Sequence, residues 1–178
     1  MTERMIQLGF KEADIKSINI NPFEKIGDRW MLITAGDEKG YNTMTASWGG
    51  LGVMWGKPVA TAVIRPQRYT KEFVDNCECF TLSFYPEDKK SALAFCGANS
   101  GRDMKPGEKA EKAGLTPLFT DGTAAFEEAE MIFVCKKLFA APIKEEDFLD
   151  KGLVDKWYSA KDFHIAYTAE ITACYVKE

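Results

Sequence analysis

The chain of 178 residues has a single histidine, no excess of positive charge and no long apolar run. One histidine excludes an H-E-x-x-H zinc site. A formal net charge of −4 argues against a nucleic-acid-binding surface, because such a surface needs a basic face. No apolar stretch approaches the ~20 residues of a membrane span, and the N-terminus lacks the apolar core of a signal peptide. We therefore expect one cytoplasmic domain over residues 1–178, with neither nucleic acid nor a membrane as partner.

Motifs of several enzyme classes are missing as well. No G-x-G-x-x-G follows an expected strand, and no G-x-S-x-G is present. Gly56-Lys57 resembles the end of a phosphate-binding loop, but Pro58 stands where that loop needs serine or threonine. Dinucleotide-binding, P-loop and serine-hydrolase chemistry are therefore disfavoured.

The cysteines provide no disulfide framework. Five is an odd number, and the chain has no signal peptide, so reduced thiols are expected. Cys77 and Cys79 form a C-x-C pair without a second pair, so no metal site is predicted.

The stretch from Asn42 to Thr70 carries the densest signal. Its first residues alternate, with the small hydroxyls of Thr43, Thr45 and Ser47 on one face. A glycine-rich turn at residues 49–52, a strand at 59–64 and a helix with Thr70 as N-cap follow. A row of hydroxyls that ends on arginines and a helix N-terminus suits a flat polar ring system carrying a phosphate. The alternative is a strand, a turn and a strand with the polar face in water.

The rest of the chain indicates a mostly antiparallel barrel with helices packed on it. Strands are expected at residues 16–20, 30–35, 42–48, 59–64, 79–85, 124–126, 131–140 and 163–176. Short helices are expected at residues 70–75, 86–96 with Gly97 closing the helix, 108–113 and 145–149. These strands do not alternate regularly with long helices, which disfavours a doubly wound parallel sheet.

Two separate segments carry groups suited to an anion. One is Arg65 with the helix start at Thr70, and the other is Ser100-Gly101-Arg102. The alternative for each arginine is a solvated surface charge. His164 is the only group whose ordinary pKa lies near neutrality, and it lies on the polar face of the last strand. A half-exposed histidine without a role is the alternative there.

Six segments together carry a family resemblance. They are Asn42-Thr-Met-Thr-Ala-Ser-Trp48, Lys57-Pro58, Arg65-Pro66-Gln67-Arg68-Tyr69-Thr70, Phe80-Thr-Leu-Ser83, Ser100-Gly-Arg-Asp103 and Asp162-Phe-His164. In this order, over roughly residues 28–175, they resemble the flavin reductase-like family and especially its flavoredoxin branch. No single segment is specific, but the ordered set is.

The resemblance implies an FMN-binding split barrel, a six-stranded antiparallel Greek-key β-barrel with peripheral α-helices. It also implies a homodimer with non-covalent FMN near the dimer interface. The residues implied beside the isoalloxazine ring are Thr45, Ala46, Ser47 and Trp48, with Asn42 and Thr43 nearby. Those implied for the ribityl phosphate are Arg65, Pro66, Gln67, Tyr69, Thr70, Ser100, Gly101, Arg102 and Asp103. His164 matches a histidine that many flavin reductases place beside the nicotinamide, which makes it the expected catalytic residue.

Three functions remain open at this stage. The first is an NAD(P)H-dependent oxidoreductase that passes hydride from NADH or NADPH to bound FMN, and electrons on to a flavin or protein acceptor. The second is a flavoredoxin-like electron carrier without its own nicotinamide site. The third is a non-redox protein in this fold. Because a flavin performs the electron chemistry itself, the first function requires no acid or base from a chain with one histidine.

Overall fold

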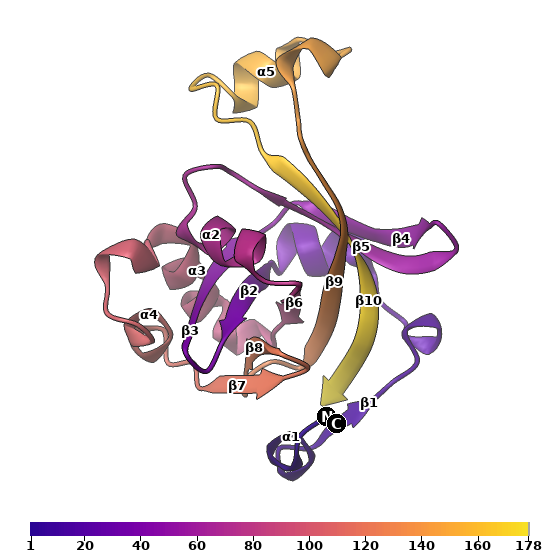
Figure 1. The fold of residues 1–178 in the computed structure, drawn as a ribbon, viewed down its shortest axis with the longest axis vertical. Coiled ribbons are helices and arrows are strands. Elements are labelled where there is room, and N and C mark those ends of the chain that lie inside the picture. The colour runs from indigo at the N-terminus through magenta and orange to yellow at the C-terminus, as the bar shows by residue number, and fades with distance from the viewer. Residues whose placement is uncertain (178) are drawn as a thin grey trace.

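The computed structural model describes residues 1–177, which form a curled antiparallel sheet with helices on one side (Figure 1). Within these residues the main sheet has eight strands, in the order β3-β2-β6-β9-β10-β5-β4, with β1 paired to the end of β10. The strands are β1 (Phe10–Glu12), β2 (Met31–Asp37), β3 (Gly40–Ala46), β4 (Gly49–Met54), β5 (Lys57–Ile64), β6 (Cys79–Phe84), β9 (Met131–Pro142) and β10 (Ile165–Lys177). A separate hairpin consists of β7 (Pro117–Thr120) and β8 (Thr123–Phe126).

The connection between β3 and β4 shows that the sheet is a split barrel. These strands are the two ends of the sheet order, yet only Ser47 and Trp48 separate them. Three Cα steps span at most about 11 Å, so the sheet must curl until its edges meet at this link. In the described residues no strand pairing joins β3 to β4, so the barrel is open there. The predicted fold class is confirmed, and β1 and β4 extend the expected six strands.

The helices gather beside β2 and β3. α2 (Tyr69–Asn76) packs on both strands, and α3 (Lys90–Ala98) packs on β3, with α4 (Glu108–Lys112) next to them (Figure 1). α1 (Glu3–Gln7) precedes β1, so it lies near the end of β10, with which β1 pairs. The short segments are the π-helical turn η2 (Phe23–Asp28) and the 3-10 turns η1 (Ile15–Ser17), η3 (Glu87–Lys89), η4 (Gly101–Asp103) and η5 (Glu145–Asp147). In residues 1–177 no helix has the length and apolar character that crossing a membrane requires.

Two buried clusters hold the fold together. The first fills the barrel with side chains such as Ile33, Leu82 and Phe133, which are fully buried. The second lies between the sheet, α3 and the β7–β8 hairpin and includes Leu93 and Phe126. Burial of apolar side chains is the main favourable contribution to folding, at roughly 25 cal/mol per Å² of apolar surface removed from water.

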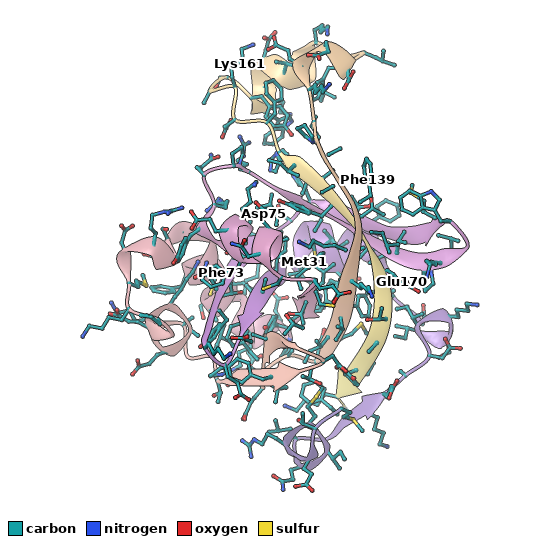
Figure 2. The ribbon with its side chains drawn as sticks, in the orientation of Figure 1. Met31, Phe73, Asp75, Phe139, Lys161 and Glu170 are labelled. Atoms are coloured by element: carbon teal, nitrogen blue, oxygen red, sulfur yellow. The ribbon has the colours of Figure 1, made fainter. Side chains whose placement is uncertain are left out.

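Residues 143–164 leave the barrel between β9 and β10 as a projecting segment, which we name the arm (Figure 1). The arm carries η5 and α5 (Gly152–Trp157), and Figure 2 shows Lys161 at this projecting end, away from Met31 in the barrel. Its base is closed by the backbone N–H of Ile143, which donates to the carbonyl of His164 at 2.8 Å. Inside the arm the rings of Tyr158 and Phe163 stack with centroids 4.7 Å apart.

Several local predictions were wrong. The glycine-rich turn expected at residues 49–52 is strand β4, and the strand expected at 16–20 is replaced by the 3-10 turn η1. The glycines pair in register with β5, which a local pattern does not reveal. Arg68 rather than Thr70 is the N-cap of α2, and Gly97 lies inside α3 rather than after it.

Candidate functional site

Two neighbouring cavities follow β3 from the split to the start of α2. The split cavity, about 170 Å³, is lined by Met44, Thr45, Ala46, Ser47, Trp48, Val63, Arg65, Arg68, Trp157 and His164. The α2 cavity, about 240 Å³, is lined by Asn42, Met44, Gln67, Arg68, Tyr69, Thr70, Ala98, Asn99, Ser100, Gly101 and Lys109. Met44 and Arg68 line both, so the two cavities adjoin at these side chains, and we name the pair of cavities the groove.

The arm forms one wall of the split cavity. The indole ring of Trp157 meets that of Trp48 edge to face, with centroids 4.9 Å apart. Arg65 ties the arm to the barrel, because its Nη2 donates to the carbonyl of Trp157 at 2.9 Å and its Nη1 lies 2.5 Å from Asp162 Oδ2. Gln67 Nε2 donates to the same carboxylate oxygen at 2.7 Å. The hydrogen bonds from Gln67 and Arg65 lower the pKa of Asp162 below its ordinary value.

His164 lies at the junction of the arm and β10, and only 8% of its surface is exposed. Its Nδ1 is 2.9 Å from the hydroxyl of Tyr158, and its ring centroid is 5.2 Å from that of Trp48. Burial, followed by the positive charge of Arg65, lowers the pKa of His164 to about 4. The sequence left both protonation states open, whereas this environment favours the neutral imidazole near pH 7.

The α2 cavity faces the first turn of α2. Arg68, the N-cap, makes no side-chain capping hydrogen bond, although its carbonyl accepts from the Lys71 N–H at 3.0 Å. Within residues 1–177 the backbone N–H groups of Tyr69 and Thr70 have no backbone or side-chain acceptor. These N–H groups and the positive end of the helix dipole favour an anion. Behind them, Asn42 Nδ2 donates to Thr70 Oγ1 at 2.8 Å, and both side chains are buried.

The loop after α3 closes the other side of the α2 cavity. Gly101 packs so closely on Asn42 that an added Cβ would lie 2.1 Å from Asn42 Oδ1. Ser100 caps the 3-10 turn η4 by accepting from the Arg102 N–H at 3.2 Å. This loop therefore keeps its position only with glycine at residue 101.

Lys109 brings a buried cation to the α2 cavity. It is 6% exposed, and its Nζ donates to the carbonyl of Thr43 at 2.7 Å. Burial lowers the pKa of Lys109 to about 8. An ammonium has three donors, and the carbonyl of Thr43 is its one hydrogen-bond acceptor within residues 1–177. Anion binding would supply the missing acceptor and a countercharge.

The structure brings most of the sequence-predicted site residues to this groove. Those lining the split cavity are Thr45, Ala46, Ser47, Trp48, Arg65 and His164. Those lining the α2 cavity are Asn42, Gln67, Tyr69, Thr70, Ser100 and Gly101. Thr43, Pro66, Arg102 and Asp103 line neither cavity.

Thr43 and Arg102 lie outside both cavities because each side chain has another partner. The hydroxyl of Thr43 is buried against Thr34 Oγ1 at 2.8 Å. Arg102 pairs with Glu72 at 2.5 Å on the surface, and its guanidinium lies 4.7 Å from the ring centroid of Tyr69. The cations that line the α2 cavity are instead Arg68 and Lys109, which sequence reasoning missed. Arg68 has a local signal, since it directly precedes the helix, whereas Lys109 has none.

One end of the groove, the α2 cavity, suits an anion, and the other, the split cavity, is lined by aromatic rings. A groove of this kind on a split barrel can hold an aromatic cofactor that carries a phosphate. The sequence of residues 23–178 matches the family described as flavin reductase like domain. The chain belongs to this family.

Solved structures with the same fold come from several bacteria. One is an FMN-binding domain of a flavin reductases-like enzyme from Shewanella baltica OS155, with 15% identity, a TM-score of 0.66 and coverage of 94% of this chain and 77% of that one. Another is flavoredoxin of Desulfovibrio vulgaris (Miyazaki F), with 18% identity, a TM-score of 0.65 and coverage of 94% and 78%. A third is the styrene monooxygenase flavin reductase of Pseudomonas putida S12, with 17% identity, a TM-score of 0.57 and coverage of 82% and 77%. No curated protein matches the sequence.

Proposed function

We propose that this chain binds FMN without a covalent bond, with the phosphate in the α2 cavity and the isoalloxazine ring in the split cavity. The single observation that carries the proposal is the groove itself. At one end it offers Lys109 and the uncapped start of α2, and at the other a wall of Trp48 and Trp157. Family membership and the FMN-binding structures of the same fold support it.

The residues present fit the phosphate of FMN in number and charge. A phosphate dianion needs several donors, and the α2 cavity has the N–H groups of Tyr69 and Thr70, the ammonium of Lys109 and the guanidinium of Arg68. Arg68 Nη1 already donates to the carbonyl of Gly97 at 3.0 Å, which holds the guanidinium beside the cavity. The two cations balance a dianion, and the cavity is lined by no aspartate or glutamate.

We further propose that the chain is an NAD(P)H-dependent oxidoreductase. FMN, when bound, supplies a hydride acceptor. The chain's own contribution is to hold the ring, to exclude water with Trp48 and Trp157, and to orient the donor with His164 at the cavity wall. His164, with its lowered pKa, would serve as a neutral hydrogen-bonding group rather than as an acid near pH 7.

The test is an anaerobic titration of the FMN-loaded protein with NADH and with NADPH, followed by flavin absorbance. We expect one of the two to bleach the flavin fully. A yellow protein that neither donor bleaches would contradict the oxidoreductase proposal and leave the flavoredoxin-like carrier. One observation favours this carrier function. Trp157 packs edge to face on Trp48 at the wall of the split cavity, which leaves less room there for a nicotinamide beside the flavin ring.

An exposed apolar patch supports a homodimer, which we propose as the functional unit. The hairpin formed by β4 and β5 exposes Val53, Met54 and Trp55, and Trp55 lies 6.4 Å from the ring of Phe139 on β9. Figure 2 shows Phe139 beside this hairpin. Contiguous exposed apolar side chains of this size are typical of interfaces.

For this dimer we expect the substitution Trp55→Glu to convert a dimer into a monomer of 20.0 kDa in sedimentation experiments. A buried unpaired carboxylate in an interface costs several kcal/mol, which is enough to separate the subunits at micromolar concentration. Phe23→Glu is the matched control, because Phe23 is 87% exposed on η2, outside this patch. A wild-type chain that sediments as a monomer would contradict the proposal.

The five cysteines support a reducing compartment such as the cytoplasm. All five are free thiols, three of them buried. Free thiols of this number are typical of proteins that work in the cytosol. We therefore propose a cytoplasmic location.

A further inference from the structure

The contact between Tyr158 and His164 determines which edge of the imidazole the split cavity offers. The hydroxyl of Tyr158 is 2.9 Å from Nδ1 of His164, and both side chains are buried. Both residues belong to the arm, and His164 is its last residue before β10, so this hydrogen bond fixes His164 within the arm beside the split cavity. The ring of Tyr158 is itself fixed by stacking on Phe163.

The direction of this hydrogen bond follows from the acceptors that are present. A phenol is both donor and acceptor, whereas a neutral imidazole has one nitrogen of each kind. If Nδ1 carried the proton, the buried hydroxyl proton of Tyr158 would have no acceptor within residues 1–177. Leaving a buried donor unsatisfied is costly. The favoured arrangement is therefore Tyr158 donating to an unprotonated Nδ1.

The opposite edge of the ring remains accessible. In residues 1–177 the buried polar atoms without any partner are Ser83 Oγ, Tyr85 OH and Thr123 Oγ1, and Nε2 of His164 is not one of them. Because Nε2 also has no hydrogen-bond partner within these residues, it is open rather than sealed, and His164 lines the split cavity.

We propose that Tyr158 is a positioning residue that holds His164 as the neutral tautomer protonated at Nε2. The split cavity thus presents an N–H donor and binds a ligand through an uncharged acceptor, such as a carbonyl or carboxamide oxygen. This inference deepens the proposed oxidoreductase function, since it names the chemistry that the second ligand must offer. It gives His164 the role of an orienting donor, in place of a proton-transfer group.

The charges around His164 agree with a neutral ring. Arg65 and Arg68 face it and disfavour imidazolium, while Asp162 favours imidazolium but is engaged by Arg65 and Gln67. Burial acts in the same direction as the arginines, and the pKa of His164 falls to about 4. Between pH 6.5 and pH 4 the unfolded chain therefore takes up a proton that the folded chain does not. The free energy of unfolding is therefore higher above pH 6.5 and decreases as the pH falls from 6.5 to 4.

The sole histidine makes the test direct, because nitrogen-15 labelling of histidine reports one ring. In the spectrum of the purified full-length chain we expect a protonated Nε2 and an unprotonated Nδ1, unchanged between about pH 5.5 and 8. The variant Tyr158→Phe keeps the stacked ring and removes the hydroxyl, so we expect a mixture of tautomers. Tyr175→Phe, whose hydroxyl donates to Asp121 instead, is the control and should leave the spectrum unchanged.

A wild-type spectrum with the proton on Nδ1, or with an imidazolium near pH 6.5, would overturn the inference without any variant. An unchanged tautomer in folded Tyr158→Phe would overturn the role of Tyr158. These readings need no flavin, so they are independent of the proposed function. With FMN bound, Tyr158→Phe should keep its flavin and be reduced more slowly by NADH or NADPH; an unchanged rate would contradict the role of this pair in ligand orientation.

Discussion

Replacing Lys109 by methionine will weaken FMN binding about 10- to 150-fold and leave the affinity for riboflavin, which lacks the phosphate, within about twofold. The expected loss is that of one charge-assisted hydrogen bond, about 1.5–3 kcal/mol. Lys109 is the buried cation of the α2 cavity, and methionine keeps the apolar stem while removing the ammonium. Fluorescence titration of both flavins against wild type and variant gives the two ratios.

Lys112→Met is the matched control for this prediction. Lys112 lies on the same helix, is 53% exposed and pairs with Glu108 at 2.8 Å, so its loss should leave both affinities unchanged. Equal weakening of FMN and riboflavin in Lys109→Met would mean that the variant damages the fold and that the phosphate assignment is wrong.

Because the pKa of Lys109 is lowered, both stability and FMN binding should depend on pH through this residue. Because the folded pKa of about 8 lies below the ordinary 10.5, stability of the flavin-free chain should rise as the pH increases from 8 to 10.5. A bound phosphate dianion would raise that pKa again, so FMN binding above pH 8 should take up a proton. Calorimetry in buffers of different ionisation enthalpy measures the uptake, which should vanish in Lys109→Met.

Substitution of Gly101 by alanine should weaken FMN binding by distorting the α2 cavity. The added Cβ would lie 2.1 Å from the buried Asn42 Oδ1, and the carboxamide of Asn42 also holds Thr70 at the start of α2. Relief of this overlap requires the loop or the helix to move, which should lower the free energy of unfolding by about 1–3 kcal/mol. We expect FMN affinity to fall more than about tenfold, because both sides of the α2 cavity are displaced.

Gly50→Ala separates this steric effect from the general effect of losing a glycine. An added Cβ at Gly50 has no heavy atom within 4 Å, and neither Gly50 nor Gly101 has a positive φ. The control should change the free energy of unfolding by less than about 0.5 kcal/mol and bind FMN normally. Normal FMN binding by Gly101→Ala would show that this contact does not shape the phosphate site.

Elements with a strong local pattern were predictable from the sequence. The apolar runs that form β2, β6 and β9 lie within a few residues of the expected bounds, and so does the short helix α2. Strand β4 was missed because its three glycines, Gly49, Gly50 and Gly52, are typical of a turn. Only the pairing of this segment with β5 makes it a strand. The last strand, β10, was expected, but the register shifts in its pairing with β9, at Thr168/Ala169 and Ile171/Ala173, are not visible in its sequence.

The site was predictable where the residues lie on one element and not where partners are remote. Thr45 to Trp48 follow one another along β3 and its link, so their common position beside a cavity follows from the strand. Lys109 reaches the carbonyl of Thr43 across 66 residues, and nothing in the sequence around Lys109 marks it as buried. Arg65 was predicted to meet a phosphate, but the carbonyl of Trp157 on the arm engages it, an interaction that only the tertiary fold creates.

The most direct measurement of the central claim is the affinity of the flavin-free wild-type chain for FMN compared with riboflavin. If the phosphate lies in the α2 cavity, where a helix N-terminus, Arg68 and Lys109 meet it, FMN should bind at least about 100-fold more tightly, a difference of about 2.7 kcal/mol. Equal affinity for the two flavins, or no binding of FMN, would contradict the account.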